Sequence, residues 1–251
     1  MLHLLACGPL VPDEYIVPGE LPTEETRGRG ALALREGELA VLPGALAAWF
    51  DGGVLVEGRA DGLYRDGELI EPLEAHAWAG EGPYWIAATE FGVVSRDLNW
   101  PVYADAVATD GLRYLALFCE DRVCTVLDLG EAEPLSETTP GGDVALFEGV
   151  AWWTNPMLGE DHGEGVATSE HGDHVWGLPG DNLRRMDRGW VVGNFNADIV
   201  PNRGRAIHLA SGLTLAIERG SAGRPLDIAA MDGRVVLAVP EREVLLNIQL
   251  P

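Results

Sequence analysis

The chain has 251 residues, of which 40 are Asp or Glu and 17 are Lys or Arg, so its formal net charge is −23 at pH 7. An apolar fraction of 47% excludes a disordered chain and is typical of a folded globular protein. The acidic field repels phosphate, which argues against sequence-independent nucleic-acid binding. No apolar run approaches the roughly 20 residues that a membrane helix needs.

The first 30 residues are predicted to hold one strand followed by an irregular strap. Residues 2–6 are apolar except for His3, but they lack the basic start and the length of an export signal, so we expect a strand there. The segment 9–30 is rich in Pro and acidic residues, which favours a loop or strap. Without an export signal, the expected location is cytoplasmic or virion-associated.

From about residue 45 onward the chain repeats one unit: a short apolar strand, an acidic-Gly turn and a second apolar strand. Val, Leu and aromatic residues favour the strands, and the turns supply the positive φ angles of tight hairpins. The second turn residues stand at positions 52, 82, 111, 149, 188 and 233. Their mean spacing of about 36 residues is too long for one hairpin and suits a four-stranded unit.

Further strands are predicted after several of these hairpins, at 62–70, 123–129 and 243–250. No segment carries an apolar stripe of helical period over ten residues, so helix is expected to be scarce.

Two of the repeats, 106–129 and 228–250, resemble the propeller repeats of NHL-like and quinoprotein-like proteins. The shared pattern is a run of small apolar residues, an acidic-Gly turn and a Val/Leu strand. The chain lacks the Trp-Asp dipeptides of WD40 repeats and the paired glycines of kelch repeats. The resemblance implies an all-β fold, a β-propeller over about 45–251, and it carries over no catalytic residues.

Closure of the ring sets the expected number of blades. About 70 residues separate position 233 from position 52 across the two termini, which is room for about two units and predicts seven blades. In that arrangement the strand at 2–6 completes the last blade beside the C-terminal strand. Six blades with an N-terminal extension is the main alternative, and a two-sheet sandwich is a weaker one. One domain is expected over 1–251, with 1–30 as strand and strap and 31–251 as blades.

The three cysteines, Cys7, Cys119 and Cys124, are too few for a disulfide framework. Cys119 and Cys124 bracket a predicted hairpin turn and can face each other across two strands. Two thiols are the favoured expectation because no export signal is present, and a bridge is the alternative.

Two long polar connections, 155–165 and 196–205, are predicted to join second to third strands in neighbouring blades and to share one face. Imidazole, carboxylate and amide oxygen are suitable ligands for a divalent cation such as Ca²⁺. No cofactor is otherwise predicted, and the spacing matches no zinc motif. The candidate metal ligands are His162, His171, Asp173, His174, Asn196 and Asp198.

Exposed Trp and Arg are frequent anchors of protein interfaces, although most Trp in strands pack in a core. Trp152 and Trp153 are adjacent, so they point to opposite faces of their strand and one of them can pack between different blades from the other. The candidate partner-binding residues are Trp152, Trp153, Trp176, Arg203 and Arg205.

The favoured function is a non-catalytic module that binds protein partners. A repeat scaffold, the acidity, the absence of Lys and the lack of a catalytic motif also suit a component of a larger assembly, such as a phage tail or virion. The first alternative is a Ca²⁺-dependent hydrolase or lactonase with its site on the loop face. The second is a carbohydrate-binding propeller. Neither nucleic acid nor membrane is an expected partner.

Overall fold

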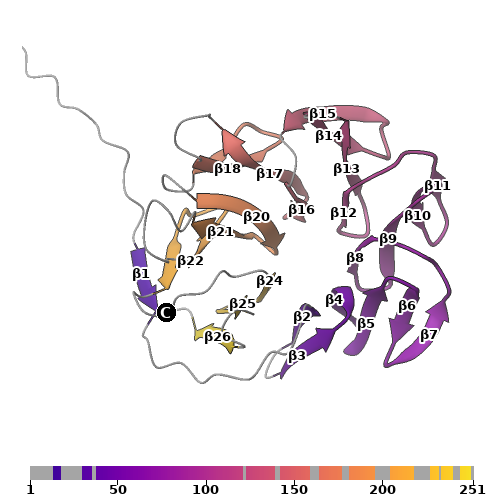
Figure 1. Ribbon diagram of the computed structural model, residues 1–251, viewed down its shortest axis with the longest axis horizontal. Coiled ribbons are helices and arrows are strands. Elements are labelled where there is room, and N and C mark those ends of the chain that lie inside the picture. Colours follow the sequence, from indigo (N-terminus) through magenta and orange to yellow (C-terminus); the bar gives the residue numbers. More distant parts are fainter. Residues whose placement is uncertain are drawn as a thin grey trace, which may run out of the picture.

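The computed structural model describes residues 14–17, 30–35, 38–120, 123–138, 142–158, 164–176, 181–195, 204–217, 227–231, 233–239 and 244–249. These residues form sheets arranged around a central axis, antiparallel except for one parallel strand pair, with one edge of each sheet toward that axis (Figure 1). The chain is therefore a β-propeller, as the repeats predict. We number the blades in chain order.

Blades 1 to 3 have four strands each, and consecutive strands pair along every sheet. Blade 1 holds β4 (Ala45–Asp51), β5 (Val54–Arg59), β6 (Gly62–Arg65) and β7 (Glu68–Glu71). Blade 2 holds β8 (Ala77–Glu81), β9 (Tyr84–Thr89), β10 (Gly92–Ser95) and β11 (Asn99–Trp100). Blade 3 holds β12 (Ala106–Thr109), β13 (Tyr114–Glu120), β14 (Val123–Asp128) and β15 (Glu133–Thr138).

Blades 4 to 6 continue the ring with four, five and three strands. Blade 4 holds β16 (Val144–Phe147), β17 (Val150–Leu158), β18 (Glu164–Ser169) and β19 (His174–Trp176). Blade 5 holds β20 (Asp181–Asp187), β21 (Trp190–Phe195), β22 (Gly204–His208), β23 (Thr214–Ile217) and β1 (Glu14–Val17). Blade 6 holds β24 (Asp227–Met231), β25 (Arg234–Val239) and β26 (Val244–Gln249).

A two-stranded ribbon, β2 (Gly30–Arg35) and β3 (Glu38–Pro43), packs between blade 6 and blade 1. Leu32 and Leu34 of β2 share an apolar cluster with Val236 and Leu245 of blade 6. The ribbon buries its apolar face in this way although it has no further strand of its own among the described residues.

The expected count of seven blades is wrong, and the alternative count of six is the one found. The expectation of seven blades required two complete four-stranded blades in the residues around both termini. The described part of that stretch supplies blade 6, the start of blade 1 and the ribbon. It also supplies β1, which pairs in parallel with β23 of blade 5 and not with the last blade. The segment 9–30 thus contains a strand where only a strap was expected, and the strand predicted at 2–6 lies outside the described residues.

The predicted hairpin turns are confirmed. Gly52, Gly82, Gly111, Gly149 and Gly233 all have positive φ, and so does Arg188 at the corresponding turn of blade 5. The second strand of each blade is buried on both faces; in β9, for example, Ile86, Ala87 and Ala88 have 0% exposure. Such a strand appears in sequence as a continuous apolar run rather than an alternating one.

We name the two faces of the ring by their turns. The AB face carries the turns between first and second strands, and the BC face carries the turns between second and third strands. The connections 155–165 and 196–205 join β17 to β18 and β21 to β22, so both connect second to third strands in neighbouring blades, as predicted.

The cysteine pair is bridged. Cys119 and Cys124 face each other across β13 and β14, with their Cα atoms 3.9 Å apart, and their sulfur atoms form a disulfide. The favoured expectation of two thiols is therefore wrong. The reason is the register of the hairpin, which places the two residues directly opposite each other.

Aromatic rings laid over glycines join blades 1 and 2. Trp49 of β4 covers Gly80 of β8, and Trp78 of β8 covers Gly58 of β5, so that each indole occupies the space where a Cβ would stand. The indole N–H groups of Trp49 and Trp78 donate to backbone carbonyls, which fixes both rings.

Replacing Gly80 with Ala is expected to destabilise the fold by roughly 2 kcal/mol, because the new methyl group overlaps the Trp49 ring. Urea denaturation measures the loss. Gly130→Ala is the control, since its Cβ would make only an ordinary contact at 3.4 Å with Asp128 Oδ1. Equal stability of the two variants would contradict this account of the blade interface.

Candidate functional site

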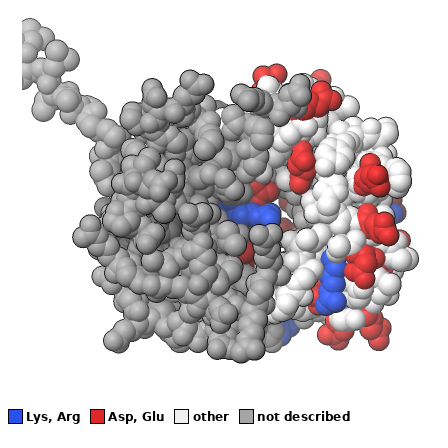
Figure 2. Space-filling view, viewed as in Figure 1, with Lys and Arg blue, Asp and Glu red and all other residues white. Residues whose placement is uncertain are grey.

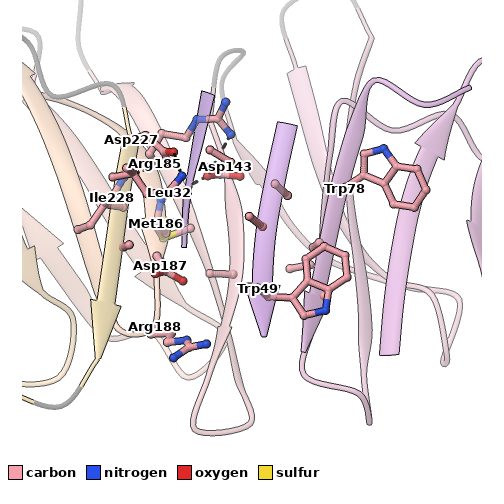
Figure 3. A pocket seen from close by; sticks show the side chains of 18 of the residues that line it. Leu32, Trp49, Trp78, Asp143, Arg185, Met186, Asp187, Arg188, Asp227 and Ile228 are labelled. Atoms are coloured by element: carbon pink, nitrogen blue, oxygen red, sulfur yellow. Dashed lines mark hydrogen bonds and ion pairs between the residues drawn. The ribbon is translucent and has the colours of Figure 1, made fainter. Parts of the chain in front are cut away.

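The first strands of the six blades and β2 of the ribbon surround a polar channel of about 190 Å³ along the axis. Figure 3 looks into this channel, where Asp143, Asp227 and Arg185 lie close together, with Asp187 and Arg188 further along. Over the described surface, acidic side chains are widely spread, and a basic side chain reaches the central opening (Figure 2).

Three carboxylates of the channel, buried at Asp143 and half-buried at Asp187 and Asp227, each join one inner strand to the next. An inner strand has no neighbour on its axial side, so its N–H groups there need another acceptor. In each case a carboxylate Oδ2 accepts a hydrogen bond from a backbone N–H of the following inner strand. The pairs are Met186 to Asp143 (3.3 Å), Ala230 to Asp187 (2.9 Å) and Leu32 to Asp227 (2.8 Å).

Burial dominates the electrostatics of these carboxylates. It raises the pKa of Asp143, that of Asp187 to about 6 and that of Asp227 to about 7. Arg185 opposes the shift for Asp143 and Asp227, and its Nη1 lies 3.9 Å from Asp143 Oδ2. The Arg185 side chain keeps 58% of its exposure, so its guanidinium also faces the open channel. The backbone hydrogen bonds give these carboxylates a role in joining the blades.

A second network joins blades 3 and 4 at the AB face. The Arg113 guanidinium donates to Asp128 Oδ2 at 2.8 Å and to Glu170 Oε1 at 2.7 Å, and it also reaches the Gly149 carbonyl at 2.9 Å. These charge-assisted hydrogen bonds lower the pKa of Glu170. Glu170 is thus committed to the blade interface.

The BC face displays large apolar side chains over blades 1 to 3. Phe91, in the turn between β9 and β10, is 89% exposed, and Tyr103, which precedes β12, is 52% exposed. Leu46 at the start of β4 and Val123 at the start of β14 are 41% and 49% exposed. His76 stacks on Tyr103 with their ring centroids 5.4 Å apart and contacts the Ala104 carbonyl through Nε2.

Trp152 and Trp153, predicted as candidate binding residues, are each only 5% exposed. Trp152 packs with Leu183 of blade 5, whereas Trp153 packs with Leu117 of blade 3. Their predicted division between different blade interfaces is confirmed. Both rings are part of the core and offer little surface to a partner.

The described part of the predicted metal set lies at the turn between β18 and β19. His171, Asp173 and His174 are exposed there. The Ser169 hydroxyl donates to Asp173 Oδ2 at 3.1 Å, and His174 Nδ1 lies 3.1 Å from the Thr168 hydroxyl. This turn belongs to the AB face.

The connection predicted to carry His162 joins the end of β17 to the start of β18 at the BC face. In the part of the chain that the structure describes, no three His, Cys, Asp or Glu residues are grouped as metal ligands. The remaining metal candidates, His162, Asn196 and Asp198, lie outside the described residues, so the metal site stays a prediction. Among the partner-binding candidates, Arg203 lies outside the described residues, and the side chains of Arg205 and Trp176 lie outside them too, so their role also stays a prediction.

Sequence reasoning missed the channel carboxylates, although a signal for them exists. Asp143 stands immediately before an inner strand, as Asp105 does outside the channel, and Asp227 is the first residue of one; all three are followed by small or branched apolar residues. An acidic residue recurring at that position would have indicated a role at the start of the inner strand. Asp187 and Arg185 lie further along their strand, so this signal does not mark them.

No protein-family model matches the chain, and no curated protein matches it. Among solved structures, it is similar to a chain of the mitotic checkpoint complex, with a TM-score of 0.60 and 11% identity over 93% of this chain and 92% of that one. It is also similar to virginiamycin B lyase from Staphylococcus aureus, with a TM-score of 0.59 and 10% identity over 92% and 99%.

Hydrazine synthase from Kuenenia stuttgartiensis gives a TM-score of 0.58 and 12% identity over 83% of this chain and 77% of that one. These neighbours differ widely in kind, and at such identities they support the propeller architecture and no narrower family.

Within the described residues, no helix has the length and hydropathy that a membrane crossing requires.

The raised pKa values predict that stability falls as the pH rises. A buried Asp whose folded pKa lies above its ordinary value of 3.8 binds its proton more tightly in the folded state. Its stabilising contribution is complete below about pH 4 and is lost as the pH passes about 7. The slope is about 1.4 kcal/mol per pH unit for each proton involved.

Asp227→Asn should reduce the slope between pH 4 and about 7, because the amide does not titrate there, while Asp187 with its pKa of about 6 keeps part of the dependence. Urea denaturation across that range, for both proteins, measures the two slopes. Parallel curves for the variant and the original protein would contradict the assignment of this titration to Asp227.

Proposed function

We propose that this chain is a non-catalytic β-propeller that binds a protein partner through its BC face. The observation that carries the proposal is the exposure of Phe91, Tyr103, Leu46 and Val123 on one face over three consecutive blades. Leu112, Tyr84 and Leu98 are exposed at the AB face as well, but the BC face carries Phe91, which at 89% is the most exposed large apolar side chain of the described residues. Exposed aromatic and apolar side chains are typical of protein interaction surfaces.

The arrangement of the channel supports a binding role over a catalytic one. The carboxylates of Asp143, Asp187 and Asp227 each accept a backbone N–H from the next inner strand. Their hydrogen-bonding capacity thus serves the scaffold. The acidic surface adds selectivity, because like charges on a wrong partner are repelled while the apolar side chains supply affinity.

A component of a larger assembly would use the same surface. A ring of blades is a rigid support, and Phe91 and Tyr103 lie on loops that this support positions. His76, stacked on Tyr103, limits the movement of that side chain and reduces the entropy lost on binding.

Site-specific photo-crosslinking tests the proposal. A photoreactive phenylalanine analogue is placed at position 91 or, separately, at position 103, in the cells that produce the chain. We expect one defined adduct from both positions, identified by mass spectrometry, and its loss when Leu46 is changed to Asp.

The matched control is position 112, where Leu112 is 88% exposed in the AB-face turn of blade 3. This position should not form the adduct. The proposal fails if positions 91 and 103 give no adduct, or if position 112 gives the same one.

A further inference from the structure

A cleft of about 440 Å³ lies between blades 1 and 2, apart from the channel and from the BC-face side chains. Its volume is within the range of about 300–1,000 Å³ that ligand pockets occupy. Several lining residues stand where strands end at the AB face, so the cleft reaches that face; they are Asp51, Arg65, Gly82, Pro83 and Arg96.

The cleft presents both polar and apolar surface. Trp49, Val56 and Leu63 lie buried at its base, whereas Trp85 and Ile70 are partly open to it. Trp49 is held in place by its indole hydrogen bond to the Gly82 carbonyl at 3.1 Å, and Trp85 packs at 5.5 Å, centroid to centroid, against Trp78. Ile70 is 50% exposed on the outer strand, which leaves apolar surface at the edge of the cleft open to solvent.

Two hydrogen-bond donors of the cleft lack a partner within the described residues. Ser95 is only 6% exposed, yet its hydroxyl forms no hydrogen bond there, although a buried polar group normally finds one. The adjacent Arg96 is exposed and likewise forms no hydrogen bond or ion pair with the described residues. Arg65, in contrast, is paired with Asp51 at 2.7 Å.

We propose that this cleft binds a small aromatic carboxylate. The aromatic ring of the ligand packs against the indole of Trp85 and the side chain of Ile70, and its carboxylate accepts hydrogen bonds from the Ser95 hydroxyl and the Arg96 guanidinium. A carboxylate satisfies both donors, and a guanidinium suits it geometrically as well as electrostatically. Glu71 also lines the cleft, but on the exposed outer strand.

The site goes beyond the proposed function, because it lies between two blades and uses none of the BC-face side chains. Binding in the cleft and partner capture at the BC face can therefore fail independently. The crosslinking at position 91 reports only on the BC face, and the titration below reports only on the cleft.

The test is a titration of the full chain labelled with 5-fluorotryptophan, followed by ¹⁹F NMR. The probes are 3-phenylpropionate, its neutral amide and phenethylamine, and Trp→Phe variants assign the resonances of Trp49 and Trp85. We expect a saturable shift of the Trp85 resonance with the acid, and binding of the amide and the amine at least about tenfold weaker.

Arg96→Gln should weaken binding of the acid by about tenfold while leaving the amide unchanged. Arg234→Gln is the matched control, since Arg234 contacts Asn247 of blade 6 and should not affect either probe. Ser95→Ala should weaken the acid more than the amide.

Three results would overturn the proposal. One is the absence of a saturable Trp85 shift with the acid at millimolar concentration. Another is amide or amine binding as tight as that of the acid. The third is an effect of Arg234→Gln equal to that of Arg96→Gln.

Discussion

Every blade of the ring turns one strand edge toward the axis, and the hydrogen-bonding groups of that edge must be satisfied without a neighbouring strand. From blade 4 round to the ribbon, the carboxylates of Asp143, Asp187 and Asp227 meet this need and tie successive inner strands together. Blades 1 and 2 are instead joined by Trp49 and Trp78 laid over glycines. One part of the ring thus relies on carboxyl groups that accept backbone hydrogen bonds, and the other on aromatic packing.

The side chains that join the blades are different from those that are exposed on the surface. The channel carboxylates are costly to bury, and burial is compensated by hydrogen bonds that also hold the blades in place. Side chains that the scaffold does not use are found elsewhere. Phe91 and Tyr103 stand on the BC face, and Ser95 and Arg96 line the cleft between blades 1 and 2. These side chains do not join the blades and are therefore available to bind a partner or a ligand.

The sequence predicted the repeating hairpins because acidic-Gly turns and apolar strands are local signals, and all six turn positions have positive φ. The blade count failed because spacing counts residues and cannot show that β1 pairs with β23 or that the ribbon stops at two strands. Trp152 and Trp153 were placed correctly between different blades by strand alternation. The cleft was not predicted, since Trp49 and Ser95 meet only after two blades pack together.

The parallel pairing of β1 with β23 joins segments that are nearly the whole chain apart in sequence. During synthesis each blade can form from neighbouring residues as it leaves the ribosome, since its strands pair in order along the chain. Glu14–Val17 is made well before Thr214–Ile217, the strand with which it pairs. The outer edge of blade 5 can therefore be completed only after blades 1 to 4 and the other strands of blade 5 have been made.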